Sequence, residues 1–235
     1  MRQFFVKTKI NDLLYLSAED YHHAVNVLRI KLQEKVCCVY QNQPYLCQVD
    51  QISSNQIACL ILAKMPLTTK NYQTTFYLPV SKQKNWDLMV EKLTELGCDC
   101  FIPVYFHYSQ KNDLIRIERL NKIIISAAKQ ANRYYLPEVK QPIQFKEMIE
   151  QLKDYQIVLL ADERCRNQKI NNQLVNKKIK NAALIVGPSA GFATHEFEIL
   201  KDKVISIKLN DNILRSETAA ISLINYWYFM MEVFN

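Results

Sequence analysis

The hydrophobic pattern changes character about a third of the way along the chain. Before residue 70, β-branched, aromatic and cysteine residues gather in short segments separated by polar turns, which predicts strands at 36–41, 45–52 and 56–63. An amphipathic helix is predicted before them at 17–28, with Ser17 as its N-cap. We therefore predict a small, mostly β barrel, and a polar linker at 65–72 ends it.

After the linker, predicted strands alternate with predicted helices. Apolar runs predict strands at 74–80, 100–104, 156–161, 182–186 and 203–207. Helical spacing predicts a helix through 86–96 that Gly97 ends as its C′ residue, a long helix through 114–131, and a helix at 194–201. This alternation is typical of an α/β fold with a parallel sheet, in which ligands bind beyond the carboxyl ends of the strands.

The terminal helix, predicted at 216–234, is apolar on two faces. One stripe includes Ile224 and Tyr228, and the other includes Leu223 and Trp227. A helix that is apolar nearly all round must be buried on both sides. Core packing satisfies this requirement, and so does a helix shared between the core and a partner subunit. We expect the shared arrangement, and therefore a homodimer.

Composition and charge add few constraints. The 235 residues carry a formal net charge of +7, which is compatible with nucleic acid as a partner but does not establish one. Seven cysteines without a CxxC spacing predict free, mostly buried thiols in a reducing compartment. Charges interrupt the apolar residues of the N-terminus, so we predict no secretory signal and a cytoplasmic protein.

Two of the chain's three glycines lie close together in "GPSAGF", at Gly187 and Gly191, directly after an apolar run. Ordinary usage would give about sixteen glycines in a chain of this length. Glycine is required where φ is positive or where another group approaches the backbone too closely for a Cβ. A tight turn from strand to helix explains the pair, and so does a ligand that lies against that turn.

The common catalytic motifs do not occur in this sequence. GxSxG, HExxH and GxxxxGK[ST] are all missing, which removes the usual hydrolase and P-loop interpretations. His22 and His23 are adjacent on a predicted helix and point about 100° apart, so we predict no metal site there. Thr194 is predicted as a helix N-cap, with His195 at the surface of the first turn.

Five stretches of sequence, in their order, carry a resemblance to a known family. They are "HHAVNVLRIK" at 22–31, "KLTELGCDCFIPV" at 92–104, "AAKQANRYYLP" at 127–137, and "LIVGPSAGF" at 184–192 with "LNDNILRSETA" at 209–219. Together they resemble the bacterial 16S rRNA (uridine-N3)-methyltransferases of the SPOUT superfamily, over almost the whole chain. The resemblance implies a PUA-like RNA-binding domain at 1–70 and a SPOUT methyltransferase domain at 73–235 with a C-terminal trefoil knot. It also implies a homodimer that acts on the rRNA of the small ribosomal subunit and binds S-adenosyl-L-methionine in the knot.

The same resemblance implies roles for individual residues. Arg215 is the first candidate for stabilising the uracil anion that forms at N3, and Arg133 is the second. The implied cofactor contacts are Leu160, Val186, Gly187, Pro188, Gly191, Leu209, Ile213, Leu214, Arg215, Glu217 and Thr218. The implied RNA contacts are Arg29, Lys31, Lys82, Lys84, Gln130 and Arg133. Each basic residue has the plain alternative of a solvated surface position.

This chain departs from the family pattern in the predicted cofactor site. The usual GPEGG is GPSAG here, with Ser189 and Ala190, and the usual LGxRILRxETA is LNDNILRSETA, with Asn210 and Asn212. We expect Asn210 to preserve its turn, because asparagine tolerates a left-handed backbone better than other residues with a side chain. The departures keep two alternatives open: a non-catalytic RNA-binding SPOUT homologue, and a SPOUT methyltransferase that acts on another RNA position.

Overall fold

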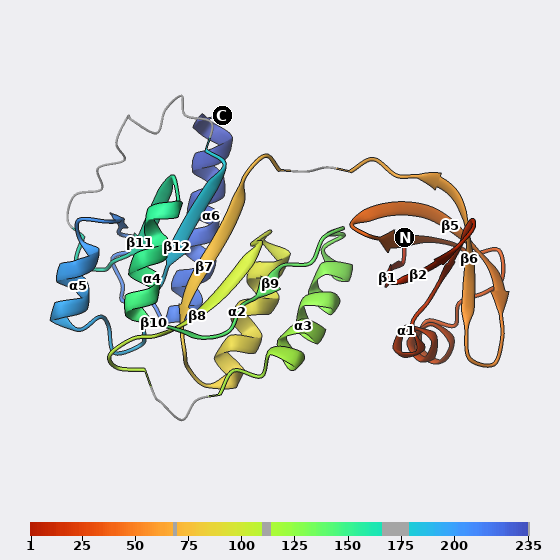
Figure 1. Cartoon of the computed structure of the whole chain (residues 1–235), viewed down its shortest axis with the longest axis horizontal. Coiled ribbons are helices and arrows are strands. Elements are labelled where there is room, and N and C mark those ends of the chain that lie inside the picture. Colours follow the sequence, from red (N-terminus) through yellow and green to blue (C-terminus); the bar gives the residue numbers. More distant parts are fainter. Residues whose placement is uncertain (68–69, 110–113, 166–178, 235) are drawn as a thin grey trace. The chain divides into compact units, whose positions relative to one another are not determined.

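The computed structural model describes residues 1–67, 70–109, 114–165 and 179–234, which form two compact units (Figure 1). The first unit comprises Met1–Thr69 together with Ala128–Tyr135, and the second comprises Lys70–Ala127 together with Leu136–Asn235. One hydrophobic cluster fills the first unit, and two others lie within the second. Each unit therefore has its own core.

The first unit is a curled six-stranded sheet with the strand order β1-β4-β5-β6-β3-β2. The strands are β1 (Gln3–Val6), β2 (Thr8–Ile10), β3 (Leu13–Tyr15), β4 (Lys35–Tyr40), β5 (Gln43–Ile52) and β6 (Ile57–Lys64). The ammonium of Lys9 on β2 lies 5.6 Å from the ring centroid of Tyr45 on β5, although two strands separate these elements in the sheet, so the sheet curls back on itself. The three predicted strands are confirmed as β4, β5 and β6. The sequence pattern missed β1, β2 and β3, which are only three or four residues long.

The helix of the first unit begins as predicted. Ser17 is the N-cap of α1 (Ala18–His22), and its Oγ accepts a hydrogen bond of 3.2 Å from the backbone N–H of Asp20. This bond satisfies one of the unpaired donors of the first turn. The helix then continues as a π-helix at His23–Val27, so its second half is wound more loosely than the predicted α-helix.

The second unit is built on a parallel sheet, as the alternation of strands and helices predicted. The strands are β7 (Gln73–Pro79), β8 (Cys100–Tyr105), β9 (Glu138–Val139), β10 (Ile143–Gln144), β11 (Ile157–Ala161), β12 (Asn181–Ile185) and β13 (Ile205–Ile207). Their order is β10-β8-β7-β12-β11-β13, with β9 beside β8, and every pairing is parallel. The chain therefore passes from β12 across β11 to reach β13.

Helices cover both faces of this sheet, because alternate strand residues point to opposite sides. Leu159 of β11 packs with buried residues of α2 (Gln83–Glu95), α3 (Ile117–Gln130) and α6 (Ser216–Phe234). Its neighbour Leu160 packs on the other side with α4 (Phe145–Gln151), the short 3₁₀ helix Leu152–Asp154 and α5 (Thr194–Leu200). The predicted helices are confirmed as α2, α3, α5 and α6, whereas α4 was not predicted.

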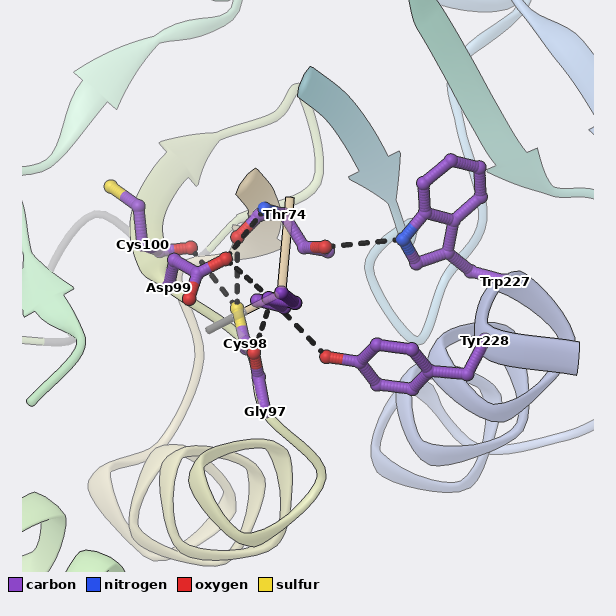
Figure 2. A network of polar contacts seen from close by, with 8 residues as sticks. Thr74, Gly97, Cys98, Asp99, Cys100, Trp227 and Tyr228 are labelled. Carbon is purple, nitrogen blue, oxygen red and sulfur yellow. Dashed lines mark hydrogen bonds and ion pairs between the residues drawn. The ribbon is translucent and has the colours of Figure 1, made fainter. Parts of the chain in front are cut away.

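Trp227 of α6 belongs to the core of the second unit. Its indole N–H donates a 3.1 Å hydrogen bond to Thr74 Oγ1, and its side chain is fully buried (Figure 2). Thr74 is held in turn by Asp99, whose carboxylate accepts a 2.8 Å hydrogen bond from the Thr74 backbone N–H. The same carboxylate forms a 2.5 Å ion pair with Lys70 Nζ. Lys70 Nζ also donates a 2.7 Å hydrogen bond to the Gly97 carbonyl. The stripe containing Trp227 therefore faces the core, and the prediction of a homodimer through this helix is left to its other residues. This stripe anchors α6 at the amino end of the sheet.

The seven cysteines are free thiols, five of them buried, as predicted. Burial, with a smaller contribution from the neighbouring Cys47, raises the pKa of Cys37 to about 11. Burial likewise raises the pKa of Cys100 to about 11. Both thiols are consequently protonated at neutral pH. None of the helices in the described parts of the chain combines the length and apolarity that a membrane crossing requires.

Candidate functional site

A cavity of about 390 Å³ opens at the carboxyl ends of three neighbouring strands of the parallel sheet. These strands end in register, since Leu160 of β11 pairs with Ile185 of β12, and Ala161 pairs with Ile207 of β13. The segments that follow them form the walls of the cavity. This is the edge at which open α/β sheets bind ligands, and it is where the sequence placed the glycine turn.

The first wall is the glycine turn, and its two glycines are required for different reasons. Gly191 has φ of +77°, and its N–H closes the turn with a 2.8 Å bond to the Pro188 carbonyl. A Cβ on Gly191 would meet no atom within 4 Å, so its left-handed backbone explains the glycine. A Cβ on Gly187 would instead lie 2.7 Å from Cε2 of Phe192. Gly191 is therefore required by its positive φ, and Gly187 by the close approach of another group, which are the two reasons for a glycine that the sequence left open.

The second wall is the segment that leads into α6. The side-chain Oδ1 of Asn210 accepts a 2.9 Å hydrogen bond from the backbone N–H of Asn212. Asn210 does not have a positive φ, so the predicted left-handed backbone is wrong. The turn is stabilised by the hydrogen bond of the Asn210 side chain and not by a left-handed conformation of its backbone. Ser216 Oγ donates 2.9 Å to the carbonyl of Gly187, which joins the second wall to the glycine turn.

The third wall, at 161–164, was missed from the sequence. Asp162 follows β11 directly, and its side chain is only 4% exposed. Its Oδ1 accepts bonds of 3.1 Å from both the backbone N–H and the Nε of Arg164, and its Oδ2 accepts 3.2 Å from Ser206 Oγ. The guanidinium of Arg164 lies 3.6 Å from the ring centroid of Phe197 on α5. The sequence contained one signal for this wall, the position of Asp162 directly after an apolar strand. Ligands bind beyond the carboxyl ends of the strands in such sheets, and the glycine turn was located by this rule.

The N-cap of helix α5 lies one residue earlier than predicted. Its N-cap is Ala193, and Thr194 is the first helical residue, so the prediction of Thr194 as the cap is wrong. The capping acceptor is the buried carboxylate of Glu196, which accepts bonds from the backbone N–H of Ala193 at 3.0 Å and of His107 at 2.7 Å. His195 is exposed, as expected, and its ring lies edge-on to that of His107.

Most of the predicted cofactor contacts line this cavity. The lining contains Val186, Gly187, Pro188, Gly191, Leu209, Ile213 and Leu214. Four other predicted contacts are not part of it. Leu160 is fully buried in the core, Glu217 is half-buried, and Arg215 and Thr218 are exposed at the start of α6. A cofactor role for these four stays a prediction.

The predicted RNA contacts are distributed over both units. Arg29, Lys31, Gln130 and Arg133 belong to the first unit, and Lys82 and Lys84 belong to the second. All of these side chains are exposed except that of Arg133, which is half-buried and has its guanidinium 5.1 Å from the ring centroid of Tyr135. The two predicted catalytic arginines are also divided, because Arg215 belongs to the second unit.

Comparisons with known proteins agree with this architecture. An RNA methyltransferase domain model matches residues 68–228, and an RNA methyltransferase PUA domain model matches residues 16–62. A ribosomal RNA small subunit methyltransferase E from Mesomycoplasma hyopneumoniae is 32% identical over 95% of this chain and 97% of its own length. The enzyme of the same name from Aquifex aeolicus is 28% identical over 96% and 98%.

A solved structure has the same fold over nearly the whole chain. The ribosomal RNA small subunit methyltransferase E from Neisseria gonorrhoeae, bound to S-adenosyl methionine, superimposes with a TM-score of 0.84 at 20% identity, covering 98% of each chain. The domain match spans more than half of this chain, and the 32% identical relative is matched almost end to end. The chain therefore belongs to the RNA methyltransferase family represented by these small-subunit enzymes.

Proposed function

We propose that the protein transfers a methyl group from S-adenosyl-L-methionine to N3 of a uridine in the 16S rRNA of the small ribosomal subunit. The observation that carries this proposal is the cavity at the carboxyl ends of β11, β12 and β13, which the glycine turn and the 209–216 segment form together. Relatives named as small-subunit rRNA methyltransferases, at 28–32% identity over nearly the whole chain, support the choice of substrate.

The cavity fits S-adenosyl-L-methionine in size and chemistry. Its volume of about 390 Å³ lies in the range of small-molecule sites, roughly 300–1,000 Å³. The glycine turn and the 209–214 segment bring backbone groups and apolar side chains to its walls, which suits a flat base held by main-chain hydrogen bonds. When bound, the cofactor supplies a methyl group on a sulfonium, ready for transfer to a nucleophile.

The chemistry of the methyl acceptor, uracil N3, determines what the residues beside the cavity must do. Uracil N3 must lose its proton before it forms the new N–C bond, and the sulfonium becomes a thioether as its own methyl bond breaks. A fixed positive charge near N3 lowers the energy of the anion. We assign this role to Arg215, which directly precedes α6 in the chain and has an exposed side chain. Arg133 is the second candidate. Because N3 lies on the Watson–Crick edge, the base must be unpaired or flipped.

The proposed assembly follows the same family. Residues 1–70 form a PUA-like RNA-binding domain, residues 73–235 form a SPOUT domain, and two cytoplasmic copies associate as a homodimer. The SPOUT domain carries the family's C-terminal trefoil knot in this proposal. The exposed Phe229 on α6 supports this helix as the contact between subunits.

The RNA lies against basic side chains of both units in this proposal. Most of these contacts are with phosphate, which positions the substrate, while the flipped base carries the specificity. The residues assigned to it are Arg29, Lys31, Lys82, Lys84, Gln130 and Arg133.

Two measurements test the proposal. Calorimetric titration should show S-adenosyl-L-methionine binding, and mass spectrometry of nuclease-digested small-subunit rRNA should show one methylated uridine that a deletion strain lacks. Arg215→Gln should lower the methylation rate at saturating cofactor by about 10²–10³-fold, the usual loss when one stabilising donor is removed. Arg116→Gln, at an exposed arginine away from the cavity, is the matched control. Cofactor binding without rRNA methylation would instead favour the non-catalytic RNA-binding alternative.

A further inference from the structure

A ring cluster, formed by His107, Tyr108 and His195, lies at the edge of the sheet that carries the cavity. His107 and Tyr108 follow β8, and His195 lies in the first turn of α5. The His107 ring packs edge-to-face with that of Tyr108, at 4.8 Å between ring centroids, and with that of His195, at 5.2 Å. All three residues are exposed. Because the sheet is parallel, the segment after β8 leaves it at the same edge as the ends of β11, β12 and β13.

An exposed aromatic ring is rare in this protein. Among the phenylalanine, tyrosine and tryptophan residues whose exposure the structure describes, Tyr108 is 52% exposed and Phe229 is 65% exposed, and the others are buried or half-buried. Phe229 lies on α6, which the proposed function assigns to the contact between subunits. Tyr108 lies on a turn at the ligand-binding edge of the sheet instead. A tyrosine ring offers a flat apolar face, and unpaired nucleobases stack on such faces.

Buried groups hold the ring cluster in place. The carboxylate of the fully buried Glu196 accepts hydrogen bonds from the backbone N–H of His107 at 2.7 Å and of Ala193 at 3.0 Å, so it joins the segment after β8 to the start of α5. That segment is a closed turn, because Ser109 Oγ accepts a 3.0 Å bond from the Phe106 N–H and the Ser109 N–H donates 2.9 Å to the Phe106 carbonyl. The rings are therefore preorganised, which reduces the entropy lost when a flat ligand stacks on them.

The ring cluster lies beside the cavity but does not line it. Phe106, which directly precedes the cluster, packs edge-to-face on Phe192 with 5.3 Å between the ring centroids, and Phe192 lines the cavity. The described lining of the cavity does not include His107, Tyr108 or His195. A base that stacks on the cluster therefore lies next to the reacting base and not in its place.

We propose that the ring cluster is a stacking platform for the nucleobase next to the target uridine, an inference that rests on the proposed function. The target base must leave its stack to reach the cofactor, so its neighbour in the strand loses a stacking partner. A ring beside the cavity replaces that partner and holds the strand with the target over the cavity. Tyr108 provides the stacking face. His107, which His195 supports, is a positioning residue that holds the Tyr108 ring.

Removal of single bases from an RNA probe tests the platform without any measurement of activity. The probe is a fluorescently labelled single-stranded pentamer, AAUAA, whose one uridine fixes the register. Two abasic versions lack the base on the 5′ or on the 3′ side of the uridine. In anisotropy titrations the wild-type protein should bind one abasic version about five- to hundredfold more weakly than the intact pentamer, the range for one base stacked on an aromatic ring. Tyr108→Leu should weaken the intact pentamer by a similar factor and bind that abasic version equally weakly.

Further variants separate stacking from charge and from damage to the fold. Tyr108→Phe is the matched control, since it keeps the ring, and its affinities should stay within about twofold of the wild type. His107→Leu should lose part of the preference for the intact pentamer. Tyr108→Leu should leave the slope of log K against log[salt] unchanged, because a stacked base releases no counterions. S-adenosyl-L-methionine should bind both leucine variants as it binds the wild type, because neither residue lines the cavity.

The outcomes distinguish the platform from the proposed function. Equal binding of the three pentamers by the wild type, no binding of any, or equal losses in Tyr108→Phe and Tyr108→Leu would overturn the platform. If small-subunit rRNA is methylated but Tyr108→Leu binds the pentamers like the wild type, the platform alone fails. If no rRNA is methylated but the pentamers bind in the expected order, the proposed function fails, and the platform stands as part of the non-catalytic RNA-binding alternative.

Discussion

Gly187 is the position where a single added methyl group should disturb both the fold and the cavity. A Cβ at this residue would lie 2.7 Å from Cε2 and 2.9 Å from Cζ of Phe192, well inside the contact distance of about 3.5–4.0 Å between carbon atoms. The Phe192 ring cannot move freely, because it packs edge-to-face on Phe106 with 5.3 Å between the ring centroids. The Gly187 carbonyl is also held, by Ser216 at 2.9 Å. Gly187→Ala should therefore cost about 1–3 kcal/mol in the free energy of unfolding, as overpacking usually does.

Trimming the opposing ring should restore much of this loss. Phe192→Leu removes the outer ring atoms that the new methyl would meet, so the double variant Gly187→Ala/Phe192→Leu should be more stable than the sum of the single effects by about 0.5–3 kcal/mol, the range for residues in contact. Urea unfolding followed by tryptophan fluorescence measures the four free energies, since Trp86 and Trp227 are both fully buried. Strict additivity would refute the collision as the cause.

Gly191 provides the contrasting case. A side chain there has space, but φ of +77° costs a residue with a Cβ about 1–2 kcal/mol. Gly191→Ala should therefore be destabilising with no rescue by Phe192→Leu, while Gly191→Asn should be milder than Gly191→Ala. Gly191→Val should abolish cofactor binding, because a β-branched residue forces the turn to open. Rescue of Gly191→Ala by Phe192→Leu would show that the two glycines do not act through separate mechanisms.

Three further predictions concern the rest of the molecule. Trp227→Glu should prevent folding, because it buries an unpaired charge. Phe229→Glu changes a side chain that is 65% exposed, so the protein should fold but run as a monomer in light scattering. An unchanged dimer in Phe229→Glu would exclude α6 as the contact between subunits. Burial raises the pKa of Cys100 from 9.0 to about 11. The protonated thiol therefore contributes stability that is complete below pH 9 and is lost as the pH rises through 11. Over this interval the free energy of unfolding in urea should fall for the wild type relative to Cys100→Ala. Neutralising Arg29 and Lys31 together should weaken RNA binding and reduce the slope of log K against log[salt] by about one to two; an unchanged slope would place these side chains away from the RNA.

Local patterns were sufficient wherever the backbone's own preferences decide the outcome. Ser17 was predicted as an N-cap and Gly97 as a C′ residue, and the structure has both, the latter with φ of +90°. The capping box of α4 shows how such a signal can be overlooked. Gln144 and Glu147 have the spacing of that motif, but the apolar run that follows them is short, so the helix was not predicted.

Pairwise contacts between distant segments were beyond the reach of the sequence. The sequence did not show which apolar stripe of the terminal helix faces the core, because a stripe looks the same whether it faces the core or another subunit, and the structure buries Trp227 in the core. The tertiary neighbours of Trp227, Thr74 among them, decided between alternatives that the pattern left equal.

The sequence by itself determined most of the strands and helices, the parallel sheet, and the edge of the sheet where a ligand would lie. These follow from hydrophobic periodicity and from glycine's freedom at φ, which are properties of short segments. Only the tertiary structure decided that Asp162 and Arg164 form a charged wall of the same cavity. Ser206 and Phe197, which hold these residues, lie more than thirty positions away along the chain. They meet the wall because β13 lies beside β11 and α5 packs on the sheet, and no local pattern encodes that neighbourhood.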